Sequence, residues 1–239
     1  MKTAAPLHVR TKKYLEKTIR TLAPGNNKLE SEPTLTKKLG ISRGTVRKAL
    51  AELYREGLIS QWHGKGNYGH PTVAALPMRF DVNSNFRLLL EQSGHTVKTT
   101  RSKWVDTMGN EEMEQRIPNA LNTAYIMFDQ EFLADNHLAI HTTVWIDKAY
   151  LVSYPKAGIY QRNIGDFFKK HCTMKSQYVI SWQKATCSKE VTSLFGLPED
   201  TPLLEWQEAY YNILDQCMGF IKVYFNPTIM DLSMLLHFS

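Results

Sequence analysis

The sequence predicts an α+β protein with two domains, a small helical domain followed by one built on an antiparallel sheet. Two observations predict the first domain: three short amphipathic segments follow one another in residues 8–56, and a glycine-rich hairpin comes after them. A third predicts the second domain. Strand hairpins separated by short helices fill residues 84–238, which favours an antiparallel sheet.

The first domain begins with a helix over residues 8–22, which ends at a Pro-Gly-Asn-Asn turn. Ser31 can cap a second helix that runs to about residue 38, with a proline in its first turn, where a missing N–H is tolerated. Ser42 can cap a third helix, and Gly57 stops it after residue 56.

A strand over residues 58–62, a His-Gly-Lys-Gly tip and a return strand over residues 67–69 predict a two-stranded wing. Three helices followed by such a wing describe a winged helix-turn-helix. Residues 71–78 contain two prolines and no charged residue, which predicts a linker. The predicted domains are therefore 1–70, the linker 71–78, and 79–239.

The second domain alternates helices with longer strands. Helices are predicted over residues 84–92, 111–116, 164–171 and 189–195. Strands are predicted over residues 97–106, 124–133, 138–147, 176–188, 203–214, 220–226 and 233–238.

Charge is distributed unevenly along the chain. The formal net charge is +6. Residues 1–75 hold 14 Lys and Arg against 5 Asp and Glu, whereas residues 76–239 hold 15 against 18. A basic first domain and a near-neutral second one indicate a module that meets a polyanion, joined to a module with another task.

Three cysteines, Cys172, Cys187 and Cys217, are an odd number without CxxC spacing, so we expect reduced thiols. The dispersed histidines give no pair at metal-ligand spacing, and no metal or cofactor is predicted. No signal-peptide-like run and no stretch of ~20 apolar residues is present, which predicts a cytoplasmic protein.

The third helix has its bases at its start and its acids, Glu52 and Glu56, at its end, the reverse of what the helix dipole prefers. DNA phosphates would compensate for that order, and a helix with this basic face can enter a major groove. Arg43 and Arg47, one turn apart, are candidates for bonding guanine O6 and N7. The predicted core face holds Val46, Ala49, Leu50 and Leu53.

The DNA contacts predicted from this helix and the wing tip are Ser42, Arg43, Thr45, Arg47, Lys48, Lys65 and Gly66. Lys48 suits a phosphate, because an ammonium group is a point charge with little geometric selectivity. A solvated amphipathic helix is the alternative interpretation of any one of these residues. The ordered set of a capped helix, a turn, a basic helix and a Gly-x-Gly wing favours DNA binding.

The stretch LESEPTLTKKLGISRGTVRKALAELYREGLISQWHGKGNYG resembles the DNA-binding domain of the GntR family of bacterial transcription regulators. The family's DNA contacts fall on Arg43, Thr45, Arg47 and Gly66. Two positions depart from the pattern: Glu30 stands where the family usually has proline, and Pro33 where it usually has a DNA-contacting arginine. Losing that arginine implies weaker binding or an altered sequence preference.

Three stretches, FRLLLEQSG, FLADNHLAIH and VTSLFGLPEDTPLL, resemble the effector domain of the HutC-type branch, known as the UTRA domain, which has a chorismate-lyase-like fold. The resemblance implies a homodimer that binds an inverted repeat in double-stranded DNA and is controlled by a small metabolite. We predict that it acts as a repressor. The resemblance implies no enzymatic activity.

The resemblance also indicates where an effector would bind. A helix opening at Asn83, Ser84 and Asn85 exposes N–H groups that favour an anion, although an ordinary helix cap is the alternative interpretation. Arginines that the family usually carries align with Gln130 and Phe132, which predicts an effector that is less charged or held differently. The effector-binding candidates are Asn83, Ser84, Asn85, Gln130, Thr142, Tyr178, Glu208 and Tyr224.

Two alternatives remain open. The first is a constitutive DNA-binding protein whose second domain only dimerises, and the substituted arginine positions keep it open. The second is an enzyme that uses the lyase-like fold. Against it, the sequence contains no Gly-rich phosphate loop, nucleophile elbow or paired-carboxylate signature, so no catalytic residue is predicted.

Overall fold

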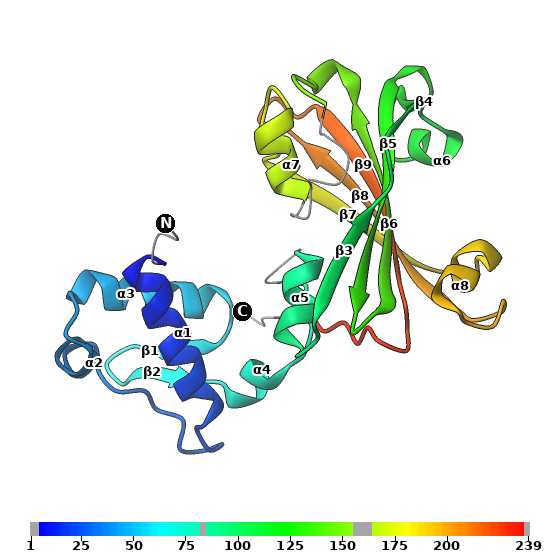
Figure 1. Ribbon diagram of the computed structural model, residues 1–239. Coiled ribbons are helices and arrows are strands. Elements are labelled where there is room, and N and C mark those ends of the chain that lie inside the picture. The colour runs from blue at the N-terminus through cyan, green and yellow to red at the C-terminus, as the bar shows by residue number, and fades with distance from the viewer. Residues whose placement is uncertain (1–4, 82–84, 155–163, 237–239) are drawn as a thin grey trace. The chain divides into compact units, whose positions relative to one another are not determined.

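The computed structural model describes residues 5–81, 85–154 and 164–236. The chain divides into two compact units: Met1–Val82 together with Leu232–Ser239, and Asn83–Asp231 (Figure 1). An N-terminal helix-turn-helix domain and a C-terminal antiparallel-sheet domain together form a mixed α+β fold, as the sequence predicts. None of the described helices is long and apolar enough to cross a membrane.

The N-terminal unit contains three helices and a hairpin. Helices α1 (Leu7–Arg20), α2 (Glu32–Leu39) and α3 (Arg43–Arg55) precede strands β1 (Ile59–Trp62) and β2 (Gly66–Gly69). The two strands pair in antiparallel register as a two-stranded wing. These elements confirm the predicted winged helix-turn-helix.

Side-chain caps define where α2 and α3 begin. The Ser31 hydroxyl accepts a hydrogen bond from the Thr34 N–H at 3.3 Å, and the Ser42 hydroxyl accepts one from the Thr45 N–H at 3.2 Å. Between the two helices Gly40 has φ +62°, a left-handed conformation that glycine adopts without steric penalty. Both predicted caps are therefore confirmed, and the turn between the helices is held by local chemistry.

The apolar faces of the three helices meet in one core. The predicted core face of α3 is confirmed, since its four apolar residues are all buried. Leu15 and Ile19 of α1 and Leu35 of α2 are buried against it. The acids at the end of α3 pair with α1: Glu56 Oε1 lies 2.6 Å from Lys12 Nζ, and Glu52 Oε1 lies 3.6 Å from His8 Nε2.

The segment predicted to be a linker contains a helix. Pro71–Ala75 forms α4, and its Ala74 is buried in the N-terminal core. The missing N–H of Pro71 is tolerated in a first helical turn, so this proline starts a helix rather than marking extended chain.

The predicted last strand over residues 233–238 is wrong for its described part. Only an isolated parallel bridge joins Ser233 to Arg79, with hydrogen bonds from Phe80 N to Ser233 O and from Ser233 N to Met78 O, both 3.2 Å long. The chain end therefore returns to the N-terminal unit instead of adding a strand to the sheet.

The second unit is built on an antiparallel seven-stranded sheet. Its strand order is β3-β5-β6-β9-β8-β7, and β4 also pairs with β5. The strands are β3 (Val97–Arg101), β4 (Val105–Met108), β5 (Ala124–Ala134), β6 (His137–Asp147), β7 (Tyr178–Thr186), β8 (Leu203–Tyr211) and β9 (Cys217–Phe225). The single strand predicted over residues 97–106 is thus two strands, because the chain leaves the sheet between Arg101 and Val105.

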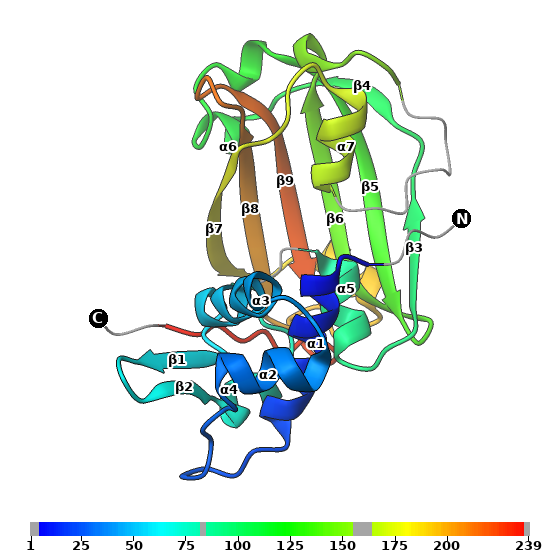
Figure 2. The same cartoon turned by 90° about the vertical axis from the view of Figure 1, so that its left-hand side faces the viewer.

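Helices cover both faces of the sheet. Helices α5 (Phe86–Gln92) and α7 (Ile164–His171) lie on one face, which is turned to the viewer in Figure 2. Helices α6 (Glu111–Glu114) and α8 (Lys189–Phe195) lie on the other. Two short 3-10 helices, Ala120–Asn122 and Lys148–Tyr150, adjoin β5 and β6. We refer to the two sides as the α5/α7 face and the α6/α8 face.

Aromatic side chains fill the α5/α7 face. Phe86 of α5 makes edge contacts with Phe132 and Phe225, with ring centroids 5.8 Å and 5.6 Å apart. Phe168 of α7 lies 5.2 Å from Tyr210, centroid to centroid. These contacts anchor α5 and α7 above opposite ends of the central strands.

The three cysteines are unpaired, with Cys172 buried, Cys187 exposed and Cys217 in between. Burial raises the pKa of Cys172 to about 12 and that of Cys217 to about 11. Both thiols are therefore protonated near neutral pH.

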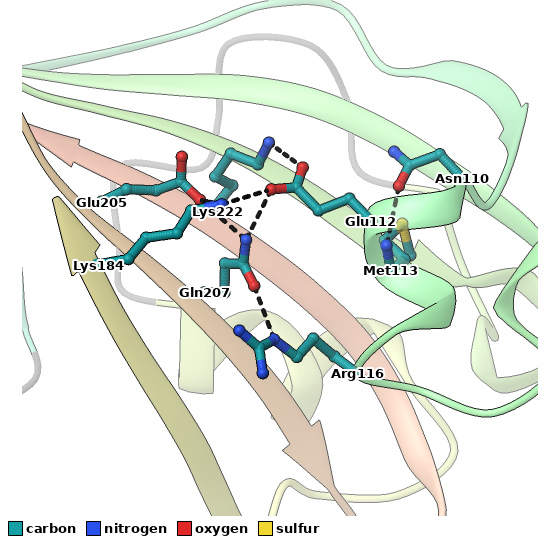
Figure 3. Close-up of polar contacts among 8 residues, drawn as sticks. All are labelled: Asn110, Glu112, Met113, Arg116, Lys184, Glu205, Gln207 and Lys222. Atoms are coloured by element: carbon teal, nitrogen blue, oxygen red, sulfur yellow. Dashed lines mark hydrogen bonds and ion pairs between the residues drawn. The ribbon is translucent and has the colours of Figure 1, made fainter. Parts of the chain in front are cut away.

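A polar network attaches α6 to the sheet on the α6/α8 face (Figure 3). Glu112 Oε1 lies 3.2 Å from Lys184 Nζ and accepts a 2.7 Å hydrogen bond from Gln207 Nε2, and Glu112 Oε2 pairs with Lys222 Nζ. Gln207 also accepts a 3.0 Å hydrogen bond from Arg116 Nε. One carboxylate thus joins α6 to three strands, β7, β8 and β9.

We expect Glu112→Gln to lower the free energy of unfolding by about 1–2 kcal/mol, between the values for a hydrogen bond to a charged group and a surface ion pair. Burial opposes ionisation of Glu112, but hydrogen bonds from Lys222 and Lys184 outweigh it and lower its pKa below 4.5. This stabilisation is complete above the unfolded-state pKa and is lost as pH falls through the lower folded-state value.

Urea unfolding of the wild type and of Glu112→Gln at pH 7 and pH 3 tests this. The difference in their free energies of unfolding should be smaller at pH 3. Glu111→Gln, which changes the exposed neighbour, is the control. Equal destabilisation by the two substitutions would show that the network does not hold α6.

Candidate nucleic-acid interface and ligand cavity

The N-terminal turns of α3 present a basic surface. Arg43 and Arg47 have 62% and 60% of their side chains exposed, and Lys48 is exposed beside them. Ser42, at the cap, shares a 2.8 Å hydrogen bond between its hydroxyl and that of Thr45. The five residues that sequence analysis placed on this helix therefore lie together at its start.

Both arginines contact Glu32, the first residue of α2. Glu32 Oε2 lies 2.8 Å from Arg47 Nε and 3.4 Å from Arg43 Nε. The hydrogen bond from Arg47, and to a smaller degree that from Arg43, lowers the pKa of Glu32 below its ordinary value. Only the Nε atoms are engaged, and no residue in the described ranges pairs with the terminal nitrogens of either guanidinium.

Glu32 was not among the candidates from the sequence. Its single carboxylate fixes both arginines at their Nε atoms, so each terminal fork remains available for a bidentate contact. The sequence does show an acid one residue after the cap Ser31. It does not show that the partners of this acid lie in the next helix, α3.

The two positions that depart from the family pattern have structural consequences. Pro33 occupies the first turn of α2, and Glu30 pairs with Lys38, 3.1 Å between Glu30 Oε2 and Lys38 Nζ. Neither residue offers a positive charge toward the basic surface of α3.

The wing tip carries the remaining two predicted residues. Lys65 Nζ lies 3.7 Å above the centre of the Trp62 ring, and the Lys65 N–H donates to the Trp62 carbonyl at 2.9 Å. Gly66 has φ +104° and Gly64 has φ +72°, conformations that permit the tight tip. The tryptophan ring thus holds the single charge of the tip in place.

A small cavity of ≈ 30 Å³, taken as the space open to the centre of a water molecule, lies on the α5/α7 face of the second unit. Three candidates from the sequence, Asn85, Gln130 and Thr142, line it. The complete lining consists of Asn85, Phe86, Gln130, Phe132, Thr142, Val144, Ile164, Tyr210 and Ile221.

The remaining effector candidates lie elsewhere. Asn83 and Ser84 are outside the described residues. Asn85 caps α5, its Oδ1 accepting a 3.3 Å hydrogen bond from the Leu88 N–H, so one donor expected for an anion is already satisfied. Glu208 is on the cavity face of β8 but does not line the cavity; its carboxyl accepts a 2.6 Å hydrogen bond from Tyr210.

The structure does not bring Tyr178 or Tyr224 to this cavity. Tyr224 packs with Val191 and Phe195 of α8 on the opposite face. Tyr178, on edge strand β7, stacks on Tyr211 with ring centroids 5.0 Å apart and donates a hydrogen bond to Asp215. Side chains alternate between the two faces, and the register of β7 and β9 puts these tyrosines on the wrong side for the cavity.

Charge is scarce around the cavity. Among the described lining residues there is no Lys, Arg, His, Asp or Glu. Burial raises the pKa of the nearby Glu208, an effect that its hydrogen bond from Tyr210 only partly opposes. No group of three or more His, Cys, Asp or Glu in the described parts of the chain is arranged to hold a metal ion.

The three helices, the exposed arginines at the start of the third and the two-stranded wing define the N-terminal unit as a winged helix-turn-helix DNA-binding domain. Residues 8–68 match the family described as "Bacterial regulatory proteins, gntR family". This match covers the helices α1 to α3 and nearly all of the wing.

One curated relative matches about a third of this chain. The "HTH-type transcriptional regulator SmoD" of Agrobacterium fabrum is 37% identical over 83 residues, 33% of this chain and 34% of that protein. The chain thus matches about a third of the length of this relative.

Solved structures show the fold of the whole chain. The "possible transcriptional regulator YydK" of Bacillus subtilis aligns over 97% of both chains with a TM-score of 0.76 and 15% identity. The effector domain of PhnF from Mycobacterium smegmatis aligns over 68% of this chain and 99% of its own, with a TM-score of 0.56 and 10% identity. At these identities the likeness concerns the fold.

Substitution of Glu32 should change how the basic surface binds DNA. We expect Glu32→Gln to tighten binding to random-sequence duplex about three- to tenfold, because a negative charge near the phosphates is removed. The ratio of specific to non-specific affinity should fall, because the arginines lose the group that orients them.

Fluorescence anisotropy with a selected operator and a scrambled duplex measures both quantities. Glu30→Gln is the matched control. Glu30 is an acid two residues before Glu32, and it pairs with Lys38 and not with the arginines. If the two variants behaved alike, Glu32 would act only through its net charge.

Proposed function

We propose that this protein is a DNA-binding transcription regulator whose operator binding is controlled by a small molecule held in its C-terminal domain. The observation that carries the DNA-binding part is the pair of exposed arginines on α3, each of which contacts Glu32 through its Nε atom. In this proposal Arg43 and Arg47 read guanines in a major groove, Thr45 and Lys48 contact the backbone, and Lys65 enters the adjacent minor groove.

The protein is proposed to act as a homodimer on an inverted repeat. A dimer with two recognition helices places its half-sites about one helical turn apart, so a palindromic operator mirrors the two-fold symmetry of the protein. The gntR match of the N-terminal domain supports this mode of binding. We propose repression as the sign of regulation, by blocking transcription in the absence of the ligand.

The C-terminal domain is proposed to be an effector domain of the HutC-type branch, with the chorismate-lyase-like fold. Its likeness to the effector domain of PhnF supports this assignment, as does a cavity lined by Gln130 and Thr142. The regulators among the relatives favour regulation over catalysis.

A second function has one observation in its favour. The narrowness of the cavity, with ≈ 30 Å³ open to the centre of a water molecule, suits a domain that only dimerises and binds no ligand. Thermal unfolding against a metabolite panel separates the two, since a ligand at ~100 times its Kd adds roughly 2.7 kcal/mol to stability. A panel without any shift, with DNA binding intact, would favour the dimerisation domain.

Selection of duplexes from a random library, followed by anisotropy titrations, tests the DNA-binding function. We expect Arg43→Ala and Arg47→Ala each to lose about 1–3 kcal/mol of operator affinity and to relax specificity at one position of each half-site. Lys48→Ala should weaken all duplexes alike and reduce the slope of log affinity against log salt by about 1 per contacted phosphate.

Lys37→Ala, at an exposed position in the last turn of α2, is the control and should leave the selected sequence unchanged. Selection of the same sequence by the wild type and by the double arginine variant would contradict the assignment of base reading to α3.

A further inference from the structure

Gln130 lines the cavity on the α5/α7 face and carries a buried polar atom without a partner among the described residues. Gln130 is 7% exposed, and its side-chain nitrogen Nε2 has no hydrogen-bond partner among the described residues. The backbone carbonyl of Gln130 is satisfied, because it accepts a 2.9 Å hydrogen bond from the Thr142 hydroxyl. A buried amide N–H without a partner is destabilising, so a ligand group that accepts from it would be favoured.

The side-chain amide can present either of its ends to the cavity. Its oxygen and nitrogen exchange places on a half-turn about the last side-chain bond, so the donor can be aimed at a bound molecule. Gln130 lies in the middle of β5, with both neighbouring strands paired to it, which keeps the backbone position fixed.

The rest of the lining is mainly apolar. Phe86, Phe132, Val144, Ile164 and Ile221 provide most of it, together with the ring of Tyr210. The other two polar residues are partly committed: the Thr142 hydroxyl donates to the Gln130 carbonyl, and Asn85 Oδ1 caps α5. A ligand rich in hydroxyl groups would therefore bury several of them without partners.

Charged groups near Gln130 are turned to other partners. Arg101 lies opposite Gln130 in the β3–β5 register, but its guanidinium carbon sits 3.8 Å above the Phe128 ring and 5.6 Å from the Phe167 ring centre. Glu208, on the same face, bonds to Tyr210. An anionic ligand would lose its hydration against described lining residues that include no cation.

We propose that the cavity takes a small, uncharged and largely apolar ligand with one carbonyl- or amide-like group that accepts a hydrogen bond from Gln130 Nε2. This inference rests on the proposed ligand-binding function and specifies the chemistry of the ligand. The part of the ligand that enters the cavity is small, because ≈ 30 Å³ of space for the centre of a water molecule corresponds to about two waters, roughly the size of one carboxamide group.

A matched series of probes tests the chemistry on the full chain. Pentanamide, pentanoate and pentylammonium share one tail and differ in charge, and glucose 6-phosphate represents anionic sugars. Saturation-transfer NMR at pH 7 with each probe up to ~20 mM covers the weak affinities that so few atoms can reach. We expect pentanamide to bind at least tenfold more tightly than either charged analogue.

Gln130→Leu separates ligand binding from folding. It replaces the unpartnered amide by an apolar group, so the ligand-free variant should unfold at a higher temperature than the wild type while pentanamide binding falls at least tenfold. Gln130→Met repeats the test with an unbranched side chain, should the leucine be poorly accommodated. Gln183→Leu, an exposed position on β7, is the control and should not alter pentanamide binding.

Three outcomes would overturn the inference: no pentanamide binding at ~20 mM, pentanoate binding as tightly as pentanamide, or undiminished binding by the Gln130 variants. Operator titrations distinguish this failure from failure of the regulator function. If glucose 6-phosphate changed operator affinity while pentanamide did not bind, the ligand class would be wrong and the regulator function would stand. Loss of operator binding altogether would refute the function itself.

Discussion

The alternation of side chains along the four central strands decides what each face of the second unit can do. In β5, β6, β9 and β8, one set of side chains builds the aromatic wall and the cavity beneath α5 and α7. The other set builds the charged network beneath α6 and the apolar contacts of α8. Each pairing keeps one register over most of its length, with irregularities only near strand ends, at Phe132/Leu133 and Tyr210/Tyr211. A shift of one residue would therefore exchange the two environments.

The N-terminal unit depends on a different constraint, the placement of three acids. Glu52 and Glu56 at the end of α3 pair with His8 and Lys12 of α1, so they tie α3 to the first helix. Glu32 is matched by the arginines at the start of α3. The ion pairs of these three acids thus connect α3 to α1 and α2. The acids at the end of α3 contact α1, whereas the basic residues at its start are exposed.

Local signals in the sequence predict the elements well and their partners poorly. The caps Ser31 and Ser42 and the core face of α3 follow from spacing within one helix, and the structure confirms them. Glu32 could not be assigned, because its partners lie 11 and 15 residues away in another helix. Tyr178 and Tyr224 show the same limit in the sheet: the face on which a strand residue lies depends on pairing with distant strands, which one strand's pattern does not reveal.

The bridge between Arg79 and Ser233 makes the N-terminal unit discontinuous in sequence. During synthesis the helices and the wing leave the ribosome early, but the segment that pairs with residues 78–80 emerges only after the whole sheet domain has been made. The last contacts of the DNA-binding unit therefore form after translation of the second domain. A fragment that stops at the end of the winged helix would lack part of its own domain.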